Sequence, residues 1–534
     1  MILEAGALML SPIAAYYGWN FNKYFLNGGS IQKNGMFYTW SNAASSANPP
    51  PKSYITGHRW TPIETIKSEA RKNKAKKDGI YVNNFKFWDD YVFETKMPNF
   101  LRKKSEKVEY YLEASKLTRT MLVLGSPGSG KTEFFHNILQ QDWYDKAVIF
   151  GKKFDFEPIY FRGTSIDILV NPKLKDSVQH NILGEDMEYI EVFIETLKNA
   201  ALGDKDDYFS SSAMQEVQKY LQKVKIKAEE DNLTVIEQWE LLFKLYEDAY
   251  QEATGGKQNS LKDVFTSIKT FMTPLYLIGY RIIEGSPTFT VKDFFDRKEP
   301  CKLFLSANDP SVEGLCAATY SVLTKYQLSL PNNWSDKPVL HLQDEYNSLK
   351  EMMPERILIE QREVGRSKLF ATLIGVQDLK ADVKISQELL VSMQYLVVFG
   401  GTDTSTLNTI SDLVGSVEYE NVKQNESYSN QGKNTSYSTV KEKEKILNNY
   451  HINILQEEGF SHLFISLKEK LLFKAYTPQV EVKERDYNDF SQINLNPFYK
   501  WKLEKGEAVE LMAQKQEEVA GLNAASMLES VGVE

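Results

Sequence analysis

Residues 125–132 read GSPGSGKT and match the pattern G-x-x-x-x-G-K-[ST]. Glycines allow successive backbone N–H groups to point inward toward a phosphate, and a following helix adds its positive end. We expect Lys131 to neutralise the β- and γ-phosphates and Thr132 to ligate Mg²⁺. The residues expected to surround the phosphates are Gly125, Ser126, Pro127, Gly128, Ser129, Gly130, Lys131 and Thr132. This phosphate loop predicts a site for a nucleoside triphosphate.

Two carboxylates follow the strand-like run PVLHLQ at residues 338–343. Asp344 is placed to hold Mg²⁺ through water, and Glu345 could orient or deprotonate the attacking water. Taken alone, this acidic pair would favour an ordinary turn after a core strand. Together with the phosphate loop it indicates a hydrolytic site.

Further candidates lie in REVGRSKLFATLIGVQDL, residues 362–379. Gln377 ends the next strand-like run, where it could sense the γ-phosphate or the attacking water, or simply bind backbone groups. In a ring of motor subunits, an arginine commonly completes the site of the next subunit by stabilising transition-state charge. We favour Arg366 over Arg362 for that role, with an ordinary surface arginine as the alternative.

Short apolar runs predict the strands that position these residues. Runs such as MLVLG from Met121 and KAVIF from Lys146 are typical of buried parallel strands. From about 183 to 290, helical spacing replaces this pattern. The sequence therefore predicts an α/β fold, a RecA-like P-loop NTPase core with a mostly parallel sheet and an inserted all-α domain. That insertion explains why Lys131 and Asp344 lie 213 positions apart.

We expect five segments along the chain. They are an N-terminal segment with a linker at 1–78, the two parts of a nucleotide-binding domain at 79–182 and 296–500, the inserted all-α domain at 183–295, and a C-terminal helical tail at 501–534.

Two local stretches carry separate expectations. The uncharged stretch from Ala5 to Trp19 is shorter than the roughly 20 residues of a spanning helix and contains Pro12. It is either a buried or interfacial segment or the remnant of a membrane anchor. Residues 421–445 are polar and poor in apolar side chains, which predicts a mobile loop.

Composition narrows the class of protein. Hydrophobic residues make up 42% and charged residues 25% of the chain, as in soluble globular proteins. A net charge of -9 argues against a surface coated in positive charge for nucleic acid, although a basic channel would still be compatible. Cys301 and Cys316 cannot make a disulfide framework, which favours a reducing compartment. No Cys/His spacing resembles a zinc site, and we expect no structural metal.

The order of these motifs resembles the type IV secretion coupling proteins, hexameric ATPases that feed DNA or effector proteins to a secretion channel. The likeness covers roughly residues 79–480. It includes the phosphate loop, LHLQDEYNSL and GRSKLFATLIGVQDL, and also IDILVNP at 166–172, DDYFSSSAMQEV at 206–217 and VVFGGTDTSTLNTISDLVG at 397–415.

Some positions match the family closely and others depart from it. Arg366, like Gln377, matches the family's spacing, whereas Leu369 stands where the family has a glycine. His341 and Gln343 interrupt a strand that is usually more uniformly apolar.

The resemblance implies an ATPase with ATP and Mg²⁺ as cofactors, assembled as a homo-hexamer with sites at subunit interfaces. It also implies DNA, single-stranded and with a relaxase, or secreted proteins as substrates, and secretion-channel components as partners. Its expected place is the cytoplasmic face of the bacterial inner membrane, or the cytoplasm if an anchor is absent. The alternatives are a related hexameric DNA-pumping or helicase-like ATPase and a nucleotide-binding substrate adaptor.

Overall fold

The computed structural model describes residues 120–202, 208–255, 259–377, 393–429, 432–447 and 460–477, apart from single positions within these ranges, together with five strands before residue 114 and a few isolated positions. The stretch from Ala5 to Trp19 and the expected tail at 501–534 lie outside the described residues. Two compact units are formed: residues 1–143 with 375–480, and residues 144–374 with 481–534.

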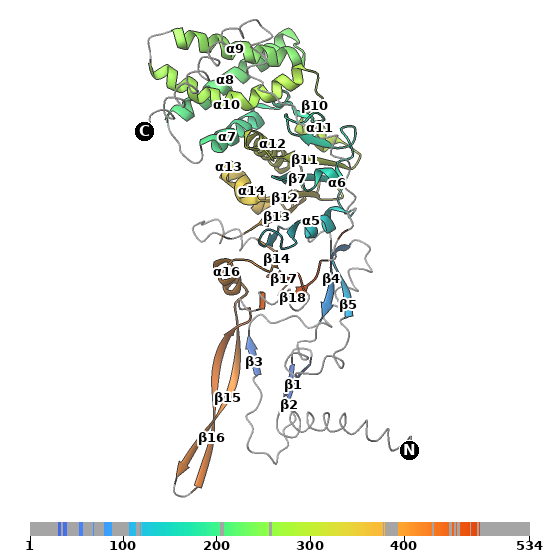
Figure 1. Ribbon diagram of the computed structural model, residues 1–534, viewed down its shortest axis with the longest axis vertical. Coiled ribbons are helices and arrows are strands. Elements are labelled where there is room, and N and C mark those ends of the chain that lie inside the picture. Colours follow the sequence, from blue (N-terminus) through green and yellow to red (C-terminus); the bar gives the residue numbers. More distant parts are fainter. Residues whose placement is uncertain are drawn as a thin grey trace, which may run out of the picture. The chain divides into compact units, whose positions relative to one another are not determined.

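The largest sheet among the described strands has nine strands, in the order β18-β17-β14-β6-β13-β12-β7-β11-β8. Its strands are β6 (Met121–Leu124), β7 (Lys146–Gly151), β8 (Ile168–Val170), β11 (Cys301–Ser306), β12 (Val339–Gln343), β13 (Phe370–Val376), β14 (Tyr395–Phe399), β17 (His462–Ser466) and β18 (Leu471–Ala475). Figure 1 labels seven of them, β7, β11, β12, β13, β14, β17 and β18.

Most of the described strand pairs are parallel. In the second unit β12 pairs in parallel with β13 and with β7, and β11 pairs in parallel with β7 and β8. In the first unit β14 pairs in parallel with β6, whereas β17 is antiparallel to both β14 and β18. Nearly every residue of these strands is buried, as expected when both faces of a parallel sheet are covered. The predicted mostly parallel sheet is confirmed.

The first unit also contains a long hairpin, formed by β15 (Ser416–Ser429) and β16 (Gly432–Lys445). The prediction of a mobile loop at 421–445 was therefore wrong. The prediction considered only the polar composition of the segment and not its pairing. The backbone groups of each strand bond to the other strand, and this bonding does not require apolar side chains. The register also sets opposite charges across from each other, as at Glu418 and Lys443.

Smaller elements complete the first unit. Helix α5 (Lys131–Leu139) follows β6, and α16 (Thr404–Val414) follows β14. Antiparallel pairs are made by β1 (Ser30–Lys33) with β2 (Met36–Thr39), by β4 (Gly79–Phe87) with β5 (Glu106–Glu113), and by β3 (Ser53–Thr56) with β15.

Four consecutive helices in the second unit occupy the segment where the sequence spacing is helical (Figure 1). They are α7 (Met187–Leu202), α8 (Tyr208–Asp231), α9 (Val235–Gly255) and α10 (Asn259–Ile283). Two short parallel strands, β9 (Gln179–His180) and β10 (Thr288–Phe289), pair on either side of this segment in the chain. The residue limits 183–295 of an inserted domain stay a prediction.

The remaining elements of the second unit are mainly short helices between strands. They are α6 (Glu157–Tyr160), the 3-10 helix η3 (Ile182–Gly184), α11 (Val291–Asp296), α12 (Pro310–Ser329), α13 (Tyr346–Met352) and α14 (Glu355–Val364). In the described part of the chain, no helix has both the length and the hydropathy needed to cross a bilayer.

Candidate nucleotide-binding site

The phosphate loop lies in the first unit, between β6 and α5. At its start the Gly125 N–H donates to the Val376 carbonyl at 3.2 Å. A Cβ atom on Gly125 would lie 2.5 Å from Ser129 Oγ and 2.7 Å from Phe399 Cβ, distances that no real Cβ tolerates. Glycine is therefore required here because the loop passes too close to β14 for any side chain.

The rest of the loop fits a phosphate. Gly128 and Gly130 have left-handed φ angles of 76° and 105°, which favour glycine, and Gly130 leads directly into α5. The Lys131 ammonium donates to the Gly125 carbonyl, so this side chain lies across the loop. The Ser129 hydroxyl is buried and has no partner among the described residues. A buried, unsatisfied hydroxyl beside a helix N-terminus is suited to a phosphate oxygen.

Gln377 belongs to the first unit with the phosphate loop. It directly follows Val376, whose carbonyl binds Gly125, and its side chain is exposed. This placement agrees with a polar residue at a strand end beside the loop.

Two residues against the loop were missed at the sequence level. Phe399 contacts the Gly125 position, and a Cβ on Gly401 would lie 2.7 Å from Ser126 Oγ, with φ at 79°. A glycine pair directly after the buried strand β14 was the available signal, but nothing local indicated which segment it approaches.

The acidic pair lies in the second unit, at the carboxyl end of β12. Its strand is held between β7 and β13, and the Asp344 N–H donates to the Phe150 carbonyl at 3.0 Å. Asp344 is 8% exposed. Glu345 has a left-handed backbone, with φ at 63° and ψ at 50°, at the start of α13. Strained backbone of this kind is concentrated at functional sites.

Two lysines after β7 bind carboxylates near this strand end. Lys153 Nζ lies 3.6 Å from Glu345 Oε1, and Lys152 Nζ lies 2.6 Å from Glu313 Oε1. Lys153 was not among the predicted site residues. In the structure the positive charge of Lys153 lies next to Glu345, the residue expected to act as base.

Arg366 lies on the turn 365–369, which joins α14 to β13 in the second unit and is called the arginine turn below. Its side chain is exposed. Leu369 has φ at 63°, the left-handed conformation that the glycine of the family would adopt easily. A leucine in this conformation is strained, because its side chain disfavours a left-handed backbone. Arg362 lies within α14.

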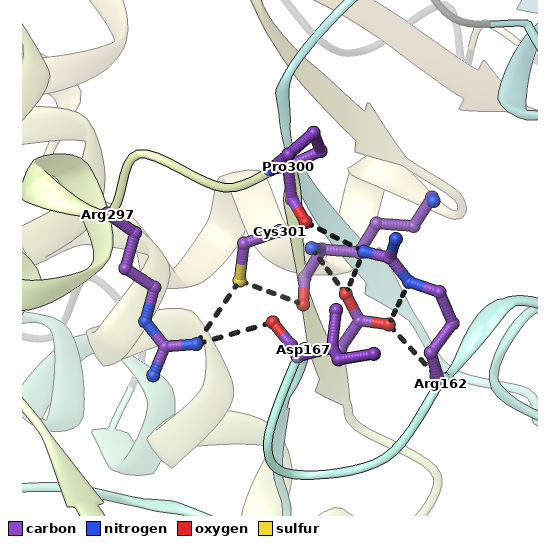
Figure 2. Close-up of polar contacts among 7 residues, drawn as sticks. Arg162, Asp167, Arg297, Pro300 and Cys301 are labelled. Atoms are coloured by element: carbon purple, nitrogen blue, oxygen red, sulfur yellow. Dashed lines mark hydrogen bonds and ion pairs between the residues drawn. The ribbon is translucent and has the colours of Figure 1, made fainter.

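The IDILVNP stretch, which carries part of the resemblance, has a structural role. Asp167 is fully buried and accepts hydrogen bonds from Arg162 Nε and Nη2 at 2.9 and 2.6 Å and from the Lys302 N–H at 2.9 Å (Figure 2). Beyond β8, Asn171 Nδ2 donates to the Ser306 carbonyl at 2.9 Å. Asp167 and Asn171 thus fasten β8 to β11 at both ends.

Figure 2 also shows Cys301 beside this carboxylate. Arg297 Nη1 donates to its sulfur at 3.8 Å and to the Ile166 carbonyl at 3.3 Å. Burial is the main cause that raises the pKa of the Cys301 thiol, so it stays protonated and is unsuited to act as a nucleophile.

Comparison with known proteins decides the family. The model of the type IV secretion-system coupling protein DNA-binding domain matches residues 110–467. The chain belongs to this family. A search of curated proteins finds no match.

Solved structures of a coupling protein share the fold. Bacterial conjugative coupling protein TrwBdeltaN70, unbound, aligns with a TM-score of 0.55 and 15% identity over 84% of this chain and 98% of that chain. TrwB with ADP and Mg²⁺ aligns with a TM-score of 0.54 and 16% identity, over 83% and 98% of the two chains. TrwB with the ATP analogue ADPNP gives 0.54 and 16%, over 84% and 99%. The predicted α/β fold is thereby confirmed.

Proposed function

We propose that this coupling protein hydrolyses ATP and uses the energy to drive DNA or secreted proteins into a type IV secretion channel. The phosphate loop is the observation that carries the proposal, because its glycine contacts, its crossing lysine and its buried Ser129 hydroxyl suit a triphosphate. The similar structures of TrwB with ADP and Mg²⁺ and with ADPNP support the choice of nucleotide.

The chain's own residues would divide the work. Lys131 would bind the β- and γ-phosphates, while Thr132 and Asp344 would hold Mg²⁺, which when bound neutralises phosphate charge. Glu345 would take the proton of the attacking water, and Gln377 would orient that water.

The assembly forms the other part of the proposal. In a homo-hexamer, Arg366 would reach the site of the next subunit and stabilise transition-state charge. Its exposure on a turn suits this role. We place the protein at the cytoplasmic face of the bacterial inner membrane, with channel components and a relaxase-bound single strand as partners. The match to a DNA-binding domain family supports DNA.

Turnover of ATP by variants tests the proposal. Lys131→Ala should abolish nucleotide binding or turnover, whereas Glu345→Gln should retain binding and lose turnover by at least about 100-fold. Equal hydrolysis by wild type and Glu345→Gln would refute the assigned base. Nucleotide binding without hydrolysis by the wild type would favour a substrate adaptor instead.

The substrate and the interface are tested in the same assay. Adding single-stranded DNA, double-stranded DNA or candidate secreted proteins should stimulate turnover only for the true substrate. Mixing Arg366→Ala subunits with Lys131→Ala subunits should restore part of the activity if Arg366 acts on its neighbour. Absence of complementation would return Arg366 to a role within its own subunit.

A further inference from the structure

A row of buried polar side chains runs through the second unit, between α12 and β12. It consists of Gln343, Tyr320, His341 and Gln327, none more than 1% exposed. Gln343 Nε2 bonds to the Tyr320 hydroxyl, which lies 2.9 Å from His341 Nδ1, and His341 Nε2 lies 2.7 Å from Gln327 Oε1. Gln327 Nε2 then donates to the Lys368 carbonyl at 3.0 Å. We call these four side chains the polar row.

The hydrogen bonds of the polar row all run in one direction. Burial lowers the pKa of His341 to about 3, so the ring is neutral and has one donor and one acceptor. Gln327 Oε1 can only accept, which assigns the proton to His341 Nε2 and leaves Nδ1 to accept from Tyr320. Burial raises the pKa of Tyr320 to about 12, so its hydroxyl keeps the proton it donates. Each member therefore donates onward, from Gln343 to the Lys368 carbonyl.

One end of the polar row fixes the arginine turn. The Lys368 carbonyl accepts from Gln327 and also from Trp334 Nε1 at 3.3 Å. The next residue, Leu369, holds a left-handed conformation that is disfavoured for its side chain and persists only where surrounding contacts enforce it. Arg366 lies two residues before Lys368 on the same turn, and its carbonyl accepts from the Leu369 N–H at 3.2 Å.

The other end reaches the acidic pair. Gln343 is the last residue of β12 and directly precedes Asp344. Its Oε1 atom is buried and has no partner among the described residues. Only one end of the row is thus saturated with partners, and the end next to Asp344 retains an unused acceptor.

We propose that the polar row is a positioning device, which fixes the arginine turn relative to the strand end bearing Asp344 so that Arg366 points toward the neighbouring subunit's nucleotide. This inference rests on the proposed function and goes beyond it, since it names the residues that control the arginine. Gln327 is a positioning residue and touches no substrate. Buried polar networks specify one geometry where their members are satisfied, as Tyr320, His341 and Gln327 are at the end of the row that binds the turn.

Gln327→Met tests the proposal, because it retains the length of the side chain and removes both of its hydrogen bonds. We expect kcat for ATP to fall about tenfold while KM stays within about twofold, since binding groups are untouched. In the Arg366→Ala background the same change should have almost no further effect, because the arginine it positions is gone. Ser321→Ala is the matched control, a buried hydroxyl on α12 that bonds only to the Ala317 carbonyl among the contacts described.

A loss of the same size with and without Arg366 would overturn the proposal and leave the row a purely structural feature. If Gln327→Met fails to fold, Trp334→Phe can be used instead, because it removes the other donor to the Lys368 carbonyl. We expect a smaller loss of kcat, seen only when Arg366 is present and absent in the Arg366→Ala background.

Hydrogen exchange separates this inference from the proposed function. The amides of residues 367–370 should exchange at least about fivefold faster in Gln327→Met than in wild type or Ser321→Ala, whether or not the protein turns over ATP. Unchanged exchange would overturn the physical link. Absence of Lys131-dependent turnover would instead refute the proposed function, with the exchange result still deciding whether the row holds the turn.

Discussion

The phosphate loop of the first unit and the arginine turn of the second hold their shapes by different means. Within the loop, Ser129 and Lys131 both approach Gly125, all within seven positions of sequence. The arginine turn is closed by its own backbone bonds, such as that from the Leu369 N–H to the Arg366 carbonyl. It is also bound by the side chains of Gln327 and Trp334, which lie 41 and 34 positions from the carbonyl they bind. A backbone conformation that requires glycine leaves a recognisable pattern in the sequence. Hydrogen bonds from side chains that lie far away in the sequence leave no such pattern.

This contrast predicts different sensitivities. The phosphate loop should lose nucleotide affinity when a closely packed glycine such as Gly125 gains a side chain, because its backbone contacts Ser129 and Phe399. The second unit should respond to changes at buried polar groups far from any motif.

A large loss of nucleotide affinity is expected at Gly125. Gly125→Ala places a Cβ against Phe399 and Ser129, so the loop must shift and nucleotide affinity should fall at least about 30-fold, equivalent to about 2 kcal/mol. Titration with a fluorescent ATP analogue measures this loss.

Gly128→Ala is the matched control, since its Cβ would enter open space. Its φ of 76° costs only about 1 kcal/mol for alanine. Equal losses for both variants would mean that backbone conformation, not close packing, sets the loop.

A buried carboxyl in the second unit gives the next effect. Glu157, at the start of α6, is 2% exposed, and burial raises its pKa to about 7 from an ordinary 4.5. Between these values the folded protein holds a proton that the unfolded chain has lost. The free energy of unfolding should therefore fall by about 3 kcal/mol as pH rises from about 4.5 to 7. Denaturant unfolding of wild type and Glu157→Gln at several pH values measures it.

The variant should lack this decline and be the more stable form above pH 7. Asp309→Asn serves as the contrasting control, because a hydrogen bond from Lys173 lowers the pKa of Asp309 to about 2 and its contribution is lost toward acid instead. Parallel pH profiles for wild type and Glu157→Gln would contradict the assignment.

The sequence predicted those features that depend on neighbours in the chain. The phosphate loop, the buried strands and the consecutive helices follow from glycine spacing and from the period of apolar residues. The parallel pairing of β13 with β12, the strand that precedes Asp344, fits the predicted alternation of strands and helices. Position-specific roles at these residues stay predictions.

What the sequence could not supply depends on contacts between distant residues. The hairpin of β15 and β16 was mistaken for a loop because each strand's partner, not its polarity, makes it a strand. Gly401 against the loop and Lys153 against Glu345 were missed for the same reason. His341 and Gln343 were seen as departures, but only their partners on α12 explain them.

The smallest effect is expected at Lys153, in the second unit but exposed. Its side chain is 60% exposed and lies 3.6 Å from Glu345, so Lys153→Met should change the free energy of unfolding by less than about 1 kcal/mol. Because the ammonium restrains the expected base, its removal should raise ATP turnover without substrate about twofold. The difference from wild type should shrink as salt approaches about 1 M, where charges are screened within about 3 Å.

Lys152→Met is the control, since it removes the same charge one position away, from a lysine bound to Glu313 rather than to Glu345. Only Lys153→Met should alter turnover, because Lys153 pairs with the expected base Glu345 whereas Lys152 pairs with Glu313. Equal changes in both variants would indicate a general effect of positive charge at this strand end. A fall in turnover with Lys153→Met would instead indicate that the Lys153 ammonium binds the nucleotide directly. Lys153 would then be a binding residue of the second unit and not a restraint on Glu345.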